Sequence, residues 1–233
     1  MTTLREFNRL KQEIAELEHR TISNVPITFR LKPSGLDGKG RVLANGKKSM
    51  ANCLNCSAKP SRMALPKHSG KFVVKVSTLE FGLSAMHLRN LAMQWFCKFK
   101  LHQDFQSWST PLGFKFLKDD RMKELQFEAK DRLGLELYKP IPGGAGNSNS
   151  GNTSRKCFAH AETFASIVQT SPDLVKAIGK LINALNSTED IDADKLESHC
   201  QDILDYFHNS EYSWNWMSHS VHAAVIHGPD LVR

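Results

Sequence analysis

The chain has 233 residues, a mass of 26.2 kDa and a formal net charge of +7 at pH 7. With 40% hydrophobic and 24% charged residues it has the composition of a globular protein, long enough for one substantial core or two small ones. Residues 1–10 lack the apolar core of a secretory signal, and no apolar run approaches the roughly eighteen residues of a membrane span. The sequence therefore predicts a soluble protein that is neither secreted nor membrane-bound.

Cysteine usage indicates a reducing compartment. Five cysteines are an odd number for a disulfide framework. Cys97, Cys157 and Cys200 lie singly in segments of helical pattern, where a small buried side chain is the usual role. We therefore expect the protein in the nucleus or the cytosol.

The first forty residues predict one helix and one strand. Apolar residues recur at helical spacing among charged ones, which predicts an amphipathic helix over residues 4–19. Residues 25–31 are β-branched and aromatic, and a turn with Pro33 and Gly35 follows them. This pattern predicts a strand that places Asp37 at or just past its end.

The next segment is basic. From Gly38 to Leu79 there is no Asp or Glu, whereas nine lysines and arginines are spread through the stretch. A run of this kind attracts phosphate, and Lys39, Arg41, Lys47 and Lys48 are its candidate DNA-binding residues. On charge alone, a solvated basic loop is an equally good interpretation. A short strand is expected at residues 72–76.

From residue 85 onwards the patterns are helical. Helices are predicted over residues 86–99, 119–133, 158–168, 172–185 and 192–207, with Ser171 as N-cap and Pro172 at the first position of the fourth. Residues 140–154 form a loop rich in Gly, Asn and Ser, which ends in Arg155 and Lys156. A flexible linker and a loop that holds a DNA phosphate together with these two cations are equally good interpretations.

Two short motifs carry metal-ligand spacing. Cys53 and Cys56 are separated by two residues in a loop, which lets one tight turn direct both sulfurs at one tetrahedral metal. His222 and His227 are separated by four residues, a spacing that allows two imidazoles to complete a Cys₂His₂ set, and His219 is a possible substitute. A redox Cys-x-x-Cys pair and two ordinary histidines are the alternatives.

Five motifs in a fixed order resemble one family. The series is Leu-Asp-Gly-Lys at 36–39, Cys-Leu-Asn-Cys-Ser-Ala-Lys-Pro at 53–60, Phe-Gly-Leu-Ser-Ala-Met-His at 81–87, Gly-Gly-Ala-Gly-Asn-Ser-Asn-Ser-Gly-Asn-Thr at 143–153, and Val-His-Ala-Ala-Val-Ile-His-Gly at 221–228. This series resembles the Transib transposases and the V(D)J recombination-activating protein 1 family. It spans the chain from about residue 25 to the C-terminus.

The resemblance implies a fold and a site. It implies an α+β architecture, with the edge of an RNase H-like domain at 1–50, a basic zinc-knuckle region at 51–84, and a zinc-stapled, mainly α-helical insertion domain at 85–233. Asp37 matches the second carboxylate of an Asp-Asp-Glu triad, and Cys53, Cys56, His222 and His227 match one structural Zn²⁺ site. The first Asp is expected upstream of this chain and the Glu downstream.

The function implied is that of a DNA endonuclease and strand transferase. The triad would hold Mg²⁺ or Mn²⁺ in the full-length parent, which acts on double-stranded DNA in the nucleus and for which a homodimer is one expected state. Because two-metal phosphoryl transfer needs several carboxylates, Asp37 alone cannot perform it, and this piece is expected to bind only zinc and DNA. A domesticated, non-catalytic zinc-dependent protein that binds DNA or another protein is the alternative.

Overall fold

The computed structural model describes residues 5, 9, 12–13, 16, 20–22, 25–27, 52–65, 72–81, 83–103, 114–141, 143 and 147–233. Five of the predicted functional residues lie outside these ranges: Asp37, Lys39, Arg41, Lys47 and Lys48. Of the helix predicted over residues 4–19, the described residues 5, 9, 12 and 13 are helical, whereas residue 16 lies in a turn.

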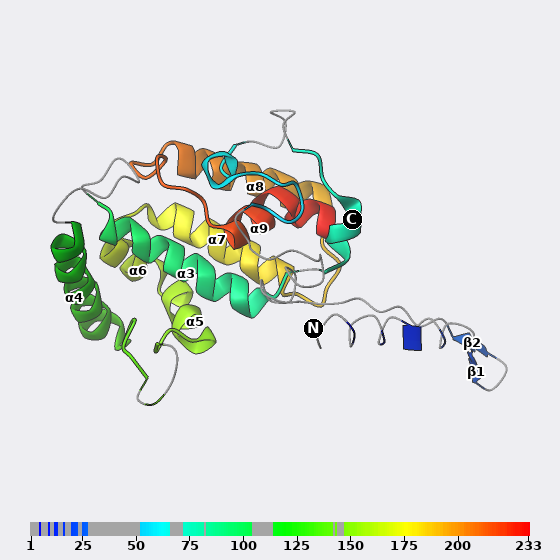
Figure 1. Ribbon diagram of the computed structural model, residues 1–233, viewed down its shortest axis with the longest axis horizontal. Coiled ribbons are helices and arrows are strands. Elements are labelled where there is room, and N and C mark those ends of the chain that lie inside the picture. The colour runs from blue at the N-terminus through cyan, green and yellow to red at the C-terminus, as the bar shows by residue number, and fades with distance from the viewer. Residues whose placement is uncertain are drawn as a thin grey trace.

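Helices form most of the described chain (Figure 1). The α-helices are α3 (Ala85–Leu101), α4 (Phe114–Leu133), α5 (Gly151–Ala159), α6 (Ala161–Val168), α7 (Pro172–Leu185), α8 (Ala193–His208) and α9 (His219–Val232). Among the described residues, the 3₁₀ helices η1 (Pro60–Arg62) and η3 (Val76–Phe81) precede them. Strands β1 (Arg20–Ile22) and β2 (Val25–Ile27) pair antiparallel, with Arg20 opposite Ile27 and Ile22 opposite Val25.

The predicted α+β fold is wrong: the residues that the structure describes are mainly α-helical and form no RNase H-like sheet. The described strands are β1 and β2 alone, three residues each, and they pair only with each other. The strand predicted at residues 72–76 is also wrong, because Phe72–Lys75 is irregular and Val76 begins η3. Short β-branched runs do not distinguish a sheet strand from other structure, and the expected sheet came from the family resemblance.

Capping side chains explain where the helices begin. Ser171 accepts a hydrogen bond from the backbone N–H of Asp173 and Pro172 occupies the first turn, so α7 begins and ends as predicted. Asp192 caps α8 in the same way. The helix predicted over 158–168 is instead two helices, because the chain leaves helical geometry at His160, where φ is −110° and ψ is 51°. Ser150 caps the first of them, so α5 begins within the predicted loop.

Helix α3 lies at the centre of the core. It contacts α4, α5, α6, α7 and α9, and its Trp95, Phe96 and Phe99 side chains are buried. The Phe99 ring stacks on Tyr212 with centroids 4.6 Å apart, and the Trp95 ring packs on Phe207 at 5.3 Å. The Trp95 indole N–H donates to the Trp216 carbonyl over 3.0 Å. These contacts join α3 to the segment that leads into α9.

Cys97, Cys157 and Cys200 are buried among apolar neighbours, as predicted. Burial raises the pKa of the Cys97 thiol to about 12. Such thiols are inert packing residues.

In the part of the chain that the structure describes, no helix is both long and apolar enough to cross a membrane.

The first prediction compares how much the Trp95 and Trp216 side chains, whose residues are joined by a hydrogen bond, contribute to stability. Trp95→Phe removes the indole donor and leaves a void, and should lower the free energy of unfolding by about 1–3 kcal/mol. Trp216 accepts through its backbone and its side chain is 41% exposed. Trp216→Phe should therefore cost less than about 1 kcal/mol. Urea denaturation measures both values, and equal losses would contradict the central position of Trp95.

Candidate metal centre

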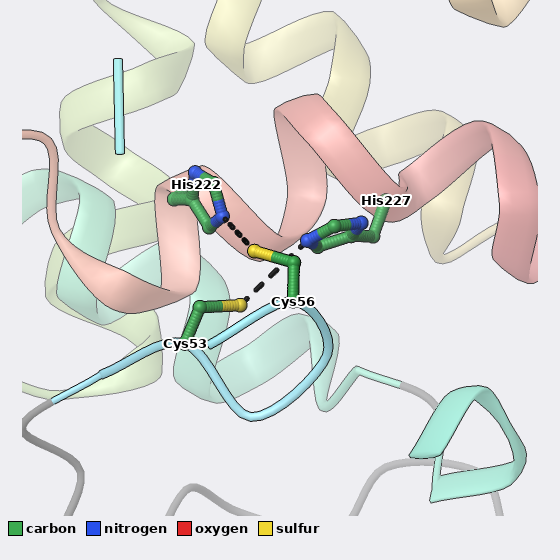
Figure 2. Close-up of side chains that lie close together, drawn as sticks. All are labelled: Cys53, Cys56, His222 and His227. Carbon is green, nitrogen blue, oxygen red and sulfur yellow. Dashed lines mark hydrogen bonds between the residues drawn. The ribbon is translucent and has the colours of Figure 1, made fainter. Parts of the chain in front are cut away.

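The two cysteines lie in a tight turn closed by backbone hydrogen bonds. The Ser57 N–H donates to the Cys53 carbonyl and the Cys53 N–H donates to the Ala58 carbonyl, both over 2.8 Å. Ser57 has φ of 60°, the left-handed conformation that reverses the chain. Figure 2 shows that this turn brings both sulfur atoms toward α9. We call residues 53–58 the cysteine knuckle.

The Asn55 side chain, between the two cysteines in the sequence, holds the knuckle in place. Asn55 is 1% exposed, and its amide nitrogen donates to the Thr78 hydroxyl over 3.2 Å. The Asn55 backbone carbonyl accepts from the Lys75 backbone N–H over 2.7 Å. The knuckle is therefore held against the start of η3 by polar contacts that do not involve the sulfurs.

Helix α9 supplies the two imidazoles. Ser218 caps it by accepting a hydrogen bond from the Val221 N–H. His222 and His227 are five positions apart, which places them about 140° apart around the helix axis. Both are fully buried, and their ring centroids lie 5.2 Å apart in an edge-to-face arrangement. Figure 2 shows both rings on the α9 side of the knuckle, with the two sulfur atoms pointing toward them.

The four ligand atoms have the spacing of a tetrahedral metal site. The Cys56 sulfur lies 3.3 Å from His222 Nε2, and the Cys53 sulfur lies 3.6 Å from His227 Nε2. All four atoms lie within 4.8 Å of one another. Zinc–sulfur bonds of about 2.3 Å and zinc–nitrogen bonds of about 2.0 Å place tetrahedral ligands about 3.3–3.8 Å apart. The group therefore fits a single metal ion such as zinc after a small contraction.

Outer contacts fix the His222 ring in the orientation that a metal requires. The Met63 carbonyl can only accept a hydrogen bond, so His222 Nδ1 carries the proton and donates to it. This leaves the Nε2 lone pair directed at the sulfurs. The Phe72 ring packs edge-on against His222 with centroids 5.7 Å apart. His227 Nδ1 has no hydrogen-bond partner among the described residues, so that ring is oriented by packing and by the contact of Nε2 with the Cys53 sulfur.

The two thiols have opposite pKa shifts. A hydrogen bond from Cys56 and contacts with both histidines hold the pKa of the Cys53 thiol far below its ordinary value, against the effect of burial. The hydrogen bond to Cys53 and burial raise the pKa of Cys56. This arrangement favours one thiolate beside one thiol, and a bound cation favours the loss of the second proton as well.

The geometry favours a metal site over redox chemistry. Redox cysteines of the Cys-x-x-Cys type are partly exposed near a helix N-terminus. Here Cys53 is 2% and Cys56 8% exposed, and they lie in an irregular turn that the backbone closes before η1 begins at Pro60. Two imidazoles at contact distance complete a set of four ligands, which leaves no open position for a substrate.

The remaining predicted site residues lie elsewhere. Arg155 and Lys156 are on α5, exposed and away from the knuckle. The described part of the preceding loop uses its polar groups internally, because the Asn149 side chain accepts from the Tyr138 N–H and Ser150 caps α5. His219 begins α9 and is not one of the four grouped ligands.

Sequence reasoning missed the supporting residues of the centre. The Met63 carbonyl is a backbone group and leaves no signal in the sequence. Asn55 is visible between the two cysteines, but its bond to the Thr78 hydroxyl, 23 positions away, depends on the fold. Comparison of the sequence with protein-family models and with curated proteins finds no significant match.

Proposed function

We propose that this chain is a zinc-organised helical domain of a DNA transposase or recombinase of the Transib type. One observation supports this most strongly. The resemblance pairs Cys53 and Cys56 with His222 and His227, and these residues form one buried group although 166 and 174 positions separate the contacting pairs. Local spacing alone would not join ligands so far apart.

Zinc is the metal that this ligand set favours. Two thiolates and two imidazoles in a tetrahedral arrangement are typical of structural zinc, whereas magnesium and calcium prefer oxygen ligands. The set is closed and buried, so the ion organises the fold rather than activating water.

The catalytic part of the proposal rests on Asp37. In the full-length parent, Asp37 and two further carboxylates would hold Mg²⁺ or Mn²⁺ for DNA cleavage and strand transfer in the nucleus. The contribution proposed for this chain is narrower. It binds zinc and contacts the phosphates of duplex DNA through basic residues, among them Lys39, Arg41, Arg155 and Lys156.

The second prediction concerns metal content. Purified protein should contain one zinc ion per chain, and Cys53→Ser or His222→Ala should reduce this to a small fraction, because three ligands remain. Cys157→Ser is the matched control: this cysteine is equally buried but belongs to the core, so zinc should be retained. Elemental analysis, with the thiolate–metal absorption of the cobalt form, measures both. Full zinc content in Cys53→Ser would show that the proposed zinc site is wrong.

The third prediction concerns stability. The ion would close a loop of roughly 170 residues. By analogy with a disulfide, closing this loop lowers the conformational entropy of the unfolded chain, which stabilises the folded state by about 5 kcal/mol. Chelation should therefore lower the melting temperature by about 10 °C or more, with α3 and α7 melting together with α9. Circular dichroism with and without chelator measures this. Coincident melts of zinc-loaded and chelated protein would show that the ion is peripheral.

The fourth prediction concerns duplex DNA. The logarithm of the binding constant should fall linearly with the logarithm of the salt concentration, because phosphate contacts release counterions. The fourfold variant Lys39→Gln, Arg41→Gln, Lys47→Gln, Lys48→Gln should lower the slope by up to about 3.6. Fluorescence anisotropy with a duplex of random sequence measures the slope. Zinc-loaded protein that does not bind duplex even at low salt would favour the alternative, a protein-interaction domain.

A further inference from the structure

A basic pocket lies between three helices on a part of the molecule separate from the metal centre. Its volume is about 380 Å³, within the range of small-ligand sites. Arg89 of α3, Arg155 of α5, and Lys176 and Lys180 of α7 line it, together with Phe158 and Asn183. Helices α3, α5 and α7 contact one another in the core (Figure 1), so the pocket walls are rigid.

Arg89 is the deepest of these cations. It is 9% exposed, and its guanidinium donates to the Asn183 side-chain oxygen over 3.1 Å, a neutral partner on α7. Burial and the neighbouring positive charge of Arg155 lower the pKa of Arg89. Two positive groups are thus held together, with no carboxylate bonded to either among the described residues.

The acidic groups nearby neutralise only part of this charge. Glu162 forms an ion pair with Lys176 at 2.7 Å, and Asp173 also faces that lysine. Arg155 donates to the neutral Asn152 side chain, and Lys180 is exposed without an ion pair to the described residues. Three cations of the pocket, Arg89, Arg155 and Lys180, therefore have no neutralising carboxylate in the described structure.

From this arrangement we infer that the pocket is a binding site for one phosphate group. Guanidinium groups bind phosphate oxygens through paired N–H donors, and a lysine adds a mobile point charge. The Asn183 contact orients Arg89 before any ligand arrives. An exposed phosphate of a DNA backbone is the ligand that this site fits; that choice of polymer rests on the proposed function, whereas the site itself does not.

The test compares two double variants of equal charge. Lys180→Gln/Arg155→Gln changes two exposed pocket cations, and Lys123→Gln/Lys195→Gln changes two exposed lysines on α4 and α8 that do not line the pocket. Inorganic phosphate is titrated into each zinc-loaded protein, with amide resonances of residues 176–183 observed by NMR. Duplex binding is then measured across salt concentrations by anisotropy.

We expect the pocket variant to bind inorganic phosphate at least tenfold more weakly than wild type and to lower the duplex salt slope by about 1.8, with the control unchanged in both. If the pocket variant loses phosphate binding and wild type does not bind duplex DNA, the result supports the site with free phosphate as its ligand and contradicts the proposed function. Duplex binding that is identical in all three proteins, with no phosphate-induced shifts in wild type, overturns the site and the DNA contact proposed for Arg155. Duplex binding would then rest on the other basic residues of the proposed function, such as Lys39 and Arg41.

Discussion

The fold depends on the convergence of four buried ligand atoms from two distant segments. Thiols and imidazoles that are withdrawn from water need partners, and here each sulfur finds an imidazole and each imidazole a sulfur. Among the described residues these contacts connect an irregular, polar segment to the last helix. Because knuckle and helix share the hydrophobic core with α3, an ion at this point would fix the position of α9 relative to the whole bundle.

Helix α9 shows why the knuckle has to lie where it does. Residues 221–229 are all buried, so the helix has no solvent-facing stripe over these nine positions. Helices α3, α7 and α8 cover part of its surface, and the knuckle and η3 cover another part. A helix that is buried all round needs cover on every side, and a short polar segment can provide it only when its own polar groups are satisfied. Asn55, with its contacts to Thr78 and Lys75, meets that requirement.

The sequence predicted those elements whose signals are local. Helix α7 has a capping serine, a proline in its first turn and a regular apolar face, and its bounds were predicted correctly. Helix α9 was missed because an all-round buried helix has no amphipathic period, and Pro229 inside it argues against a helix. The break at His160 depends on how α5 and α6 pack on α3, which no local pattern encodes. The pairing of cysteines with histidines followed from the order of motifs, and the same resemblance led to the incorrect RNase H-like sheet.

The metal centre and the basic pocket both depend on how α3, α7 and α9 pack together. Helix α7 directs Leu174, Ile178 and Leu181 into the core, where it contacts α9, and this rotation leaves Lys176 and Lys180 on its exposed side. Helix α3 likewise buries Trp95 and Phe96 beside the aromatic cluster while Arg89, near its first turns, reaches the pocket. Packed interiors resist deformation, so the positions of Arg89 and Lys180 depend on the packing of α3 and α7 on α9. An ion that holds α9 in place would therefore also help to preserve the spacing of these two cations in the proposed phosphate site.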